Sequence, residues 1–151
     1  MTTAAQQTRT TFRLEVSVTL DIAAPPERVW ALLTDAERFP AWNSTVTAIE
    51  GTIAEGEKVV IRVPYSERAF PATVLELDGA SETRRMVWGD GFAPMFRGDR
   101  TWEVTPTATG CRFSMIEVFR GAMLPMIAKS FPDFGPIFET YARDLKSAAE
   151  G

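Results

Sequence analysis

The clearest pattern in the chain is an alternation of apolar and polar residues that begins at position 12. The apolar side chains are Phe12, Leu14, Val16, Val18, Leu20 and Ile22, and polar residues stand between them. Successive side chains of a β-strand point to opposite faces, so this period of two predicts a long strand with one buried face. The residues before it show no such alternation, and we expect 1–11 to form a disordered tail.

Two short helices are expected after this strand. A Pro-Pro pair stops the strand, and proline fits the first turn of a helix because its missing N–H has no partner to lose there. Apolar residues at near-helical spacing then predict a helix over 26–34. Asp35 is a suitable cap for a second short helix over 36–39, which Pro40 would end.

The middle of the chain has the pattern of strands separated by turns. The expected strands cover 45–50, 58–63, 70–78, 83–88, 98–105 and 111–119, with glycine, proline or aspartate between most of them. This regular succession of short apolar runs and turn residues favours a meander of antiparallel strands.

Near the C-terminus the period changes from two to that of a helix. From Pro136 onward, apolar residues recur at three- and four-residue steps, and charged residues occupy the other side. This pattern predicts an amphipathic helix over 136–150, about 22 Å long. The methionine-rich segment 123–127 precedes it. We interpret that segment either as a mobile gate over a binding site or as a contact with a partner, including a second copy of the chain.

The order of these elements predicts an α+β fold for a single domain over residues 12–150. Antiparallel strands bury one face, and the apolar stripe of the long helix needs such a face to cover. We therefore expect a curved antiparallel sheet of about six to seven strands wrapped around the C-terminal helix.

One stretch resembles a known superfamily. The residues from Ile22 to Asp35, IAAPPERVWALLTD, followed by FPAWN at 39–43, resemble the opening of the SRPBCC superfamily. That group includes START-related lipid carriers, birch-pollen-allergen-like proteins and polyketide cyclases and dehydrases. The segment 98–121 is similar to its last hairpin, and the likeness spans 12–149. It implies a helix-grip fold with a cavity between sheet and helix. It leaves the substrate open, because the superfamily contains carriers, enzymes and sensors.

The composition narrows the chemistry. The chain has no histidine, which excludes Ser-His and Cys-His nucleophile pairs and histidine ligation of a metal. Cys111 is the only cysteine, so no internal disulfide forms, and we expect a cytoplasmic location. No metal or cofactor motif is present, and we expect neither. A net charge of −4 disfavours nucleic acid and anionic membrane surfaces as partners. No apolar run is long enough for a membrane span.

Glu117 and Arg100 are the candidates for chemistry. Glu117 shares one face of its strand with apolar residues, so a cavity-facing Glu117 would be a carboxylate in apolar surroundings, suited to a general acid or base. Arg100 also shares a face with apolar residues and is expected to pair with Glu117 or to bind an oxygen of a ligand. The alternatives are a structural pairing of Glu117 with an arginine across the sheet, or exposure of both strand ends to solvent.

Large apolar side chains are the expected lining of the cavity, because pockets for small molecules are mostly apolar with a few placed polar groups. The proposed lining residues are Phe70, Met86, Trp88, Trp102, Phe113, Met115, Phe134, Phe138 and Tyr141. For each of them ordinary core packing is the alternative.

Two functions from different classes follow. The first is a carrier or sensor that binds a small hydrophobic molecule, either aromatic, polyketide or lipid-like. The second is a cofactor-independent enzyme of the polyketide cyclase or dehydratase kind, in which Glu117 and Arg100 move protons and stabilise an enolate. A protein-interaction role of the methionine-rich segment, including a homodimer, is a third possibility.

Overall fold

The alternating segment forms strand β2, Arg13–Ile22, whose even-numbered side chains are buried. The computed structural model describes residues 4–151. β2 pairs along its whole length with β8, Gly110–Arg120, in antiparallel register. The two strands are far apart in sequence, and their pairing places the start of the chain beside its last strand.

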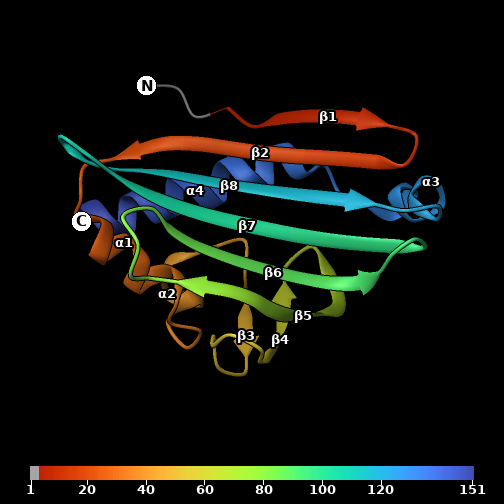
Figure 1. Cartoon of the computed structure of the whole chain (residues 1–151), viewed down its shortest axis with the longest axis horizontal. Coiled ribbons are helices and arrows are strands. Elements are labelled where there is room, and N and C mark those ends of the chain that lie inside the picture. Colours follow the sequence, from red (N-terminus) through yellow and green to blue (C-terminus); the bar gives the residue numbers. More distant parts are fainter. Residues whose placement is uncertain (1–3) are drawn as a thin grey trace.

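The sheet has eight antiparallel strands in the order β1-β2-β8-β7-β6-β5-β4-β3. The others are β1 (Gln6–Thr10), β3 (Ala48–Glu50), β4 (Lys58–Val63), β5 (Ser66–Asp78), β6 (Arg84–Phe92) and β7 (Phe96–Thr107). From β3 to β8, strands consecutive in the chain lie side by side, as the predicted meander requires (Figure 1).

Strand β1 corrects the prediction of a disordered tail. Gln6–Thr10 pairs with residues 13–17 of β2 and raises the strand number from the expected six to seven to eight. All five of its residues are exposed, so there is no buried apolar face for the sequence to reveal. The ladder of backbone hydrogen bonds defines this strand. The part of the predicted tail at residues 1–3 lies outside the described residues.

The helices are α1 (Pro26–Leu33), α2 (Phe39–Trp42), α3 (Leu124–Ile127), the 3-10 turn η1 (Ala128–Ser130) and α4 (Phe134–Glu150). The helix α1 agrees with the prediction. The prediction for α2 was wrong: this helix begins at Phe39 instead of ending there, because Pro40 occupies its first turn, where its missing N–H is not needed. Within residues 4–151 no helix has both the length and the apolar character needed to cross a membrane.

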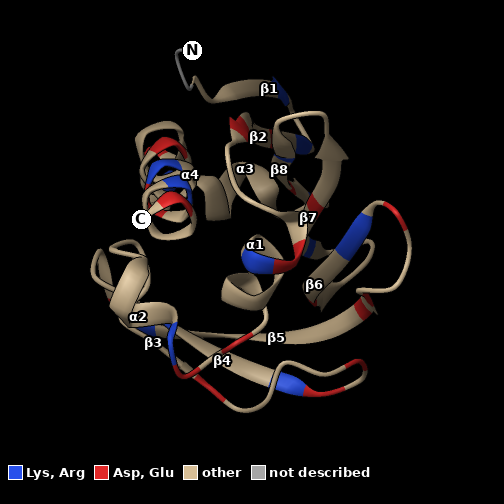
Figure 2. Cartoon of the chain, turned by 90° about the vertical axis from the view of Figure 1, so that its left-hand side faces the viewer, with Lys and Arg blue, Asp and Glu red and all other residues tan. Residues whose placement is uncertain are grey.

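The long helix α4 lies in the hollow of the curved sheet, which confirms the helix-grip arrangement (Figure 2). Asp133 caps its start by accepting a hydrogen bond from the Gly135 N–H at 3.1 Å. Its buried side chains are Phe134, Phe138, Tyr141, Ala142, Leu145 and Ala149. They pack against the inner side chains of the strands, and this contact forms the hydrophobic core.

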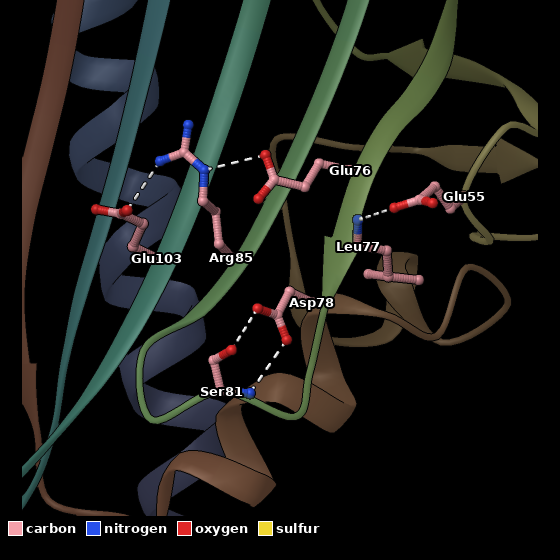
Figure 3. A network of polar contacts seen from close by, with 7 residues as sticks. All are labelled: Glu55, Glu76, Leu77, Asp78, Ser81, Arg85 and Glu103. Atoms are coloured by element: carbon pink, nitrogen blue, oxygen red, sulfur yellow. Dashed lines mark hydrogen bonds and ion pairs between the residues drawn. The ribbon is translucent and has the colours of Figure 1, made fainter.

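The outer face of the sheet carries charged side chains (Figure 3). Arg85 on β6 donates hydrogen bonds to Glu76 on β5 at 3.2 Å and to Glu103 on β7 at 2.9 Å. Beyond the end of β5, hydrogen bonds from Ser81 and Ala80 lower the pKa of Asp78. The ion pairs of Arg85 join three adjacent strands on the solvent side.

Candidate functional site

Arg100 and Glu117 face each other across β7 and β8, and the structure brings them together as an ion pair. They are directly opposed in the strand register. Arg100 Nε and Nη2 both contact the same oxygen, Glu117 Oε1, at 2.7 and 2.6 Å. Their side chains are 22% and 14% exposed. This is the cross-strand pairing that the sequence analysis gives as the alternative to catalysis. Both contacts end on Oε1, so the other carboxylate oxygen, Glu117 Oε2, takes no part in the ion pair.

Three aromatic rings surround the guanidinium group of Arg100. Its Cζ lies 4.9 Å from the ring centre of Phe138, 5.8 Å from that of Trp102 and 6.0 Å from that of Tyr141. Cations are attracted to ring faces at such distances. Burial lowers the pKa of Arg100, but the charge of Glu117 and smaller contributions from Tyr141 and Tyr65 outweigh it and raise that pKa overall. The site therefore holds a permanent cation.

Tyr141 links α4 to this cluster. The Trp102 indole Nε1–H donates a hydrogen bond to the Tyr141 hydroxyl at 3.0 Å, and both side chains are buried. Burial raises the pKa of Tyr141 well above its ordinary value, although the charge of Arg100 and the Trp102 hydrogen bond act in the opposite direction. Tyr141 is therefore a neutral phenol beside a cation.

Tyr65 is a site residue that sequence reasoning missed. It lies in the turn between β4 and β5 and is 41% exposed. Partial burial raises the pKa of Tyr65, while Arg100 lowers it and Glu117 raises it. Its hydroxyl therefore lies close enough to feel both charges of the ion pair. A turn residue belongs to no periodic pattern. The available signal was that this tyrosine, one of two in the chain, follows a proline that ends a strand.

An open groove lies beside Tyr65. It has a volume of about 210 Å³ and is lined by Ser44, Thr45, Pro64, Tyr65, Pro136, Ile137 and Thr140. These residues come from the loop after α2, the β4–β5 turn and the first half of α4. The sequence predicts an enclosed cavity between sheet and helix. The hollow at this site is an open groove, and the enclosed cavity stays a prediction.

The predicted lining residues fall into two groups. Eight of them are buried in the core cluster: Met86, Trp88, Trp102, Phe113, Met115, Phe134, Phe138 and Tyr141. Phe70 is 39% exposed and lies outside that cluster, although it shares its strand face with the buried Ala72 and Val74. The inner face of the sheet is therefore open to solvent along the first part of β5. Whether these residues contact a ligand stays a prediction.

One hydrogen-bond donor at this site is buried without a partner within residues 4–151. Trp88 Nε1 is buried without an acceptor, and Trp88 lies directly opposite Arg100 in the strand register. The Trp88 ring lies 4.7 Å from that of Trp102, which places it in the same aromatic cluster. None of the described hydrogen bonds or ion pairs of Arg100 involves its Nη1.

A comparison with family models gives one match. Residues 13–150 match the family described as "Polyketide cyclase / dehydrase and lipid transport". No curated protein is similar enough in sequence to count as a relative.

Solved structures support the fold at low sequence identity. Truncated norcoclaurine synthase from Thalictrum flavum is 15% identical with a TM-score of 0.66, covering 95% of this chain and 98% of that one. The di-domain ARO/CYC StfQ from the steffimycin biosynthetic pathway is 14% identical with a TM-score of 0.70, covering 93% of this chain and 52% of that one. A START superfamily protein from Mycobacterium smegmatis is 17% identical with a TM-score of 0.61, covering 90% and 97%.

The order of strands and helices, the position of α4 in the curved sheet and the match over nearly the whole chain agree with the resemblance in the sequence. This chain therefore belongs to the polyketide cyclase / dehydrase and lipid transport family.

Proposed function

We propose that this protein binds a small hydrophobic molecule beside α4, as a carrier or sensor, with the polar end of the ligand at the Arg100–Glu117 pair. The observation that carries the proposal is this ion pair, set among aromatic rings on the concave face. A buried ion pair contributes little net stability compared with apolar side chains of similar volume. Its presence on an otherwise apolar face is better explained by ligand binding.

The unfilled donor of Trp88 indicates what the ligand carries. A buried donor without a partner costs about 1–3 kcal/mol, which a ligand acceptor would recover. Trp88 Nε1 and the cation of Arg100 favour a ligand with one carbonyl, carboxylate or enolate oxygen on an apolar body. Aromatic side chains around the pair favour an aromatic or polyketide-like body, and a lipid-like ligand fits the same description.

Two fluorescent probes with the same apolar body test this proposal: 1-anilinonaphthalene-8-sulfonate and the uncharged N-phenyl-1-naphthylamine. We expect both to bind, the sulfonate more tightly, and we expect Trp88→Phe to reduce the difference while Arg85→Met, on the outer face, leaves it unchanged. If neither probe binds or raises the melting temperature, the binding function is wrong. If both probes bind equally, the binding function stands and only the proposed acceptor oxygen on the ligand is wrong.

An enzymatic role is the second candidate, favoured by the free oxygen of the carboxylate. Both contacts from Arg100 end on Glu117 Oε1, so Oε2 remains available to take or give a proton. Arg100 would stabilise an enolate oxygen. This role predicts that Glu117→Gln abolishes cyclisation or dehydration of a poly-β-ketone substrate while the variant stays folded. Full activity in the variant would exclude Glu117 as the acid or base.

The location of the protein and its need for other components are also open to test. A cytoplasmic location and the expected independence from metals and cofactors stay predictions from the sequence. Native mass spectrometry of protein purified from its own host would identify a bound ligand or cofactor directly by its mass.

A further inference from the structure

Four large apolar side chains are exposed at one end of the molecule. They are Phe12 in the β1–β2 turn (56% exposed), Phe92 at the end of β6 (70%), Met95 in the β6–β7 turn (41%) and Met126 on α3 (61%). Figure 1 shows both turns and α3 together at the right-hand end of the sheet. We call these four residues the apolar tip. They belong to neither the core cluster nor the groove.

Backbone hydrogen bonds hold the segments of the apolar tip together. The Gly121 N–H donates to the Phe12 carbonyl at 3.1 Å, and the Met123 N–H donates to the Met95 carbonyl at 2.9 Å. Gly121 has φ +136°, and a Cβ atom there would lie 2.3 Å from the Met95 carbonyl oxygen. Only glycine permits this close approach, so the three segments form one fixed surface.

A row of arginines lies behind the apolar tip. Arg13, Arg120 and Arg97 occupy neighbouring positions on β2, β8 and β7. The acidic residues that pair with them, Glu15 and Asp99, lie two residues further from the tip on β2 and β7.

The order from the tip inward is therefore apolar, basic, acidic. Lys129 adds a further cation next to α3, in the turn η1. Asp90 on β6 and Asp133 at the start of α4 are acidic residues towards this end that have no described ion pair.

The shape of the apolar tip argues against a second copy of the chain as its occupant. A stable dimer typically buries about 800 Å² per partner on a continuous face. Here the apolar side chains stand on two turns and a short helix.

Apolar side chains on projecting turns, with cations set behind them, match a bilayer interface. The apolar groups enter the acyl boundary while Arg13 and Arg120, which are 52% and 53% exposed, reach the anionic headgroups. We propose that this end of the molecule docks on the surface of an anionic lipid bilayer. The net charge of −4 disfavours such a partner, but it averages over the whole chain and conceals this local arrangement.

Vesicle sedimentation with the full chain tests this docking. We expect binding to vesicles of phosphatidylcholine with 30% phosphatidylserine, weaker binding to pure phosphatidylcholine, and loss of binding as salt increases. The double variant Phe92→Ser, Met126→Ser should lose at least about tenfold in vesicle affinity. Leu75→Ser, which changes an exposed apolar residue of β5 outside the tip, is the matched control and should bind as the parent chain does.

Three results would overturn the docking proposal. The first is no binding to either vesicle, and the second is equal loss in the Leu75→Ser control. The third is a concentration-dependent dimer in light scattering that the double variant abolishes, because it would assign the tip to a second copy. Docking does not depend on the proposed ligand site, so probe binding should be the same in the double variant and the parent chain.

Discussion

The two sides of the concave face differ in how completely they are covered. Along β8 and β7, side chains such as Phe113 and Trp102 are almost wholly buried under α4. Along the first part of β5, Phe70 faces the same side but is exposed, and Tyr65 lines an open groove. The Arg100–Glu117 pair lies on β7 and β8 themselves, with both side chains partly accessible.

This difference separates residues that hold the fold together from residues that are free to serve a ligand. A side chain buried on all sides contributes packing energy that is lost when it is truncated. A side chain at an open edge contributes less to folding and is available to contact other molecules. Substitutions on the covered side should therefore lower stability more than binding, and substitutions on the open side should lower binding more than stability.

Truncating a phenylalanine on each side gives the largest expected contrast. Phe113→Ala should lower the free energy of unfolding by about 3–5 kcal/mol, because the cavity left behind cannot fill. Phe70→Ala should lower it by about 1 kcal/mol or less, since much of that ring is already in water. Urea unfolding measures both. Similar losses of unfolding free energy in the two variants would show that this part of β5 is covered in solution. That result would contradict the distinction between the two sides.

Breaking the ion pair should have the next largest effect. Glu117→Gln leaves Arg100 without its counter-ion and should cost about 2–3 kcal/mol, somewhat less than for a fully buried pair. The double variant Arg100→Met, Glu117→Met should recover most of this loss, because apolar residues replace the pair without an unpaired charge. Glu76→Gln on the outer face is the control, expected to cost under about 1 kcal/mol. A double variant no more stable than the single one would contradict this explanation.

Alkaline pH should destabilise the protein through its two tyrosines. Both have a raised pKa in the folded chain, chiefly from burial. The stability that this contributes is fully present below the ordinary tyrosine pKa of about 10. It is lost as pH rises from there toward the folded pKa, because the unfolded chain gives up its protons first.

The slope from Tyr141 should approach about 1.4 kcal/mol per pH unit, and that from the more exposed Tyr65 should be smaller. Absorbance at 295 nm during titration measures the tyrosinate formed, and Tyr65→Phe assigns the two steps. Ionisation of both tyrosines near pH 10 in the folded protein would show that neither is protected.

Changes to single polar groups of the site complete the series. Trp102→Phe leaves the buried Tyr141 hydroxyl without its N–H donor, which should cost about 1–3 kcal/mol, together with some packing. Tyr65→Phe should change stability by no more than about 0.5 kcal/mol but should alter probe binding at the groove. Thermal unfolding and probe titration on the same samples compare them. Unchanged probe binding in Tyr65→Phe would show that the groove is not part of the ligand-binding site.

The sequence predicts those parts of the fold in which one face of an element is buried. The strand β2 and the helix α4 have strong periodic patterns because each has one side against the core. Strand β1 has no buried side, so nothing in its residues marks it. Pro40 was misplaced because proline both ends helices and begins them, and the sequence alone does not decide which.

The predicted turn over 106–110 does not give the Arg100–Glu117 register, because a five-residue turn there would set Arg100 opposite Ile116. In the structure the strands continue to Thr107 and Gly110, and this shift by one residue sets Arg100 opposite Glu117. The exposure of Phe70 does not follow from the sequence. Alternation shows which face a residue is on, but coverage of that face depends on where α4 and the loops come to lie. Tyr65 was missed for the same reason, since its proximity to the ion pair depends on contacts between distant parts of the chain.

Strand β1 has a consequence for how the chain behaves in concentrated solution. The first half of β2 would otherwise offer its backbone N–H and C=O groups, beside an unbroken row of buried apolar residues, to any passing extended chain. β1 occupies that position as a short strand of polar, exposed residues, one of them an arginine. Such a strand is a poor template for the addition of further strands. Removing residues 1–10 should therefore leave a protein that folds but forms intermolecular sheets on standing.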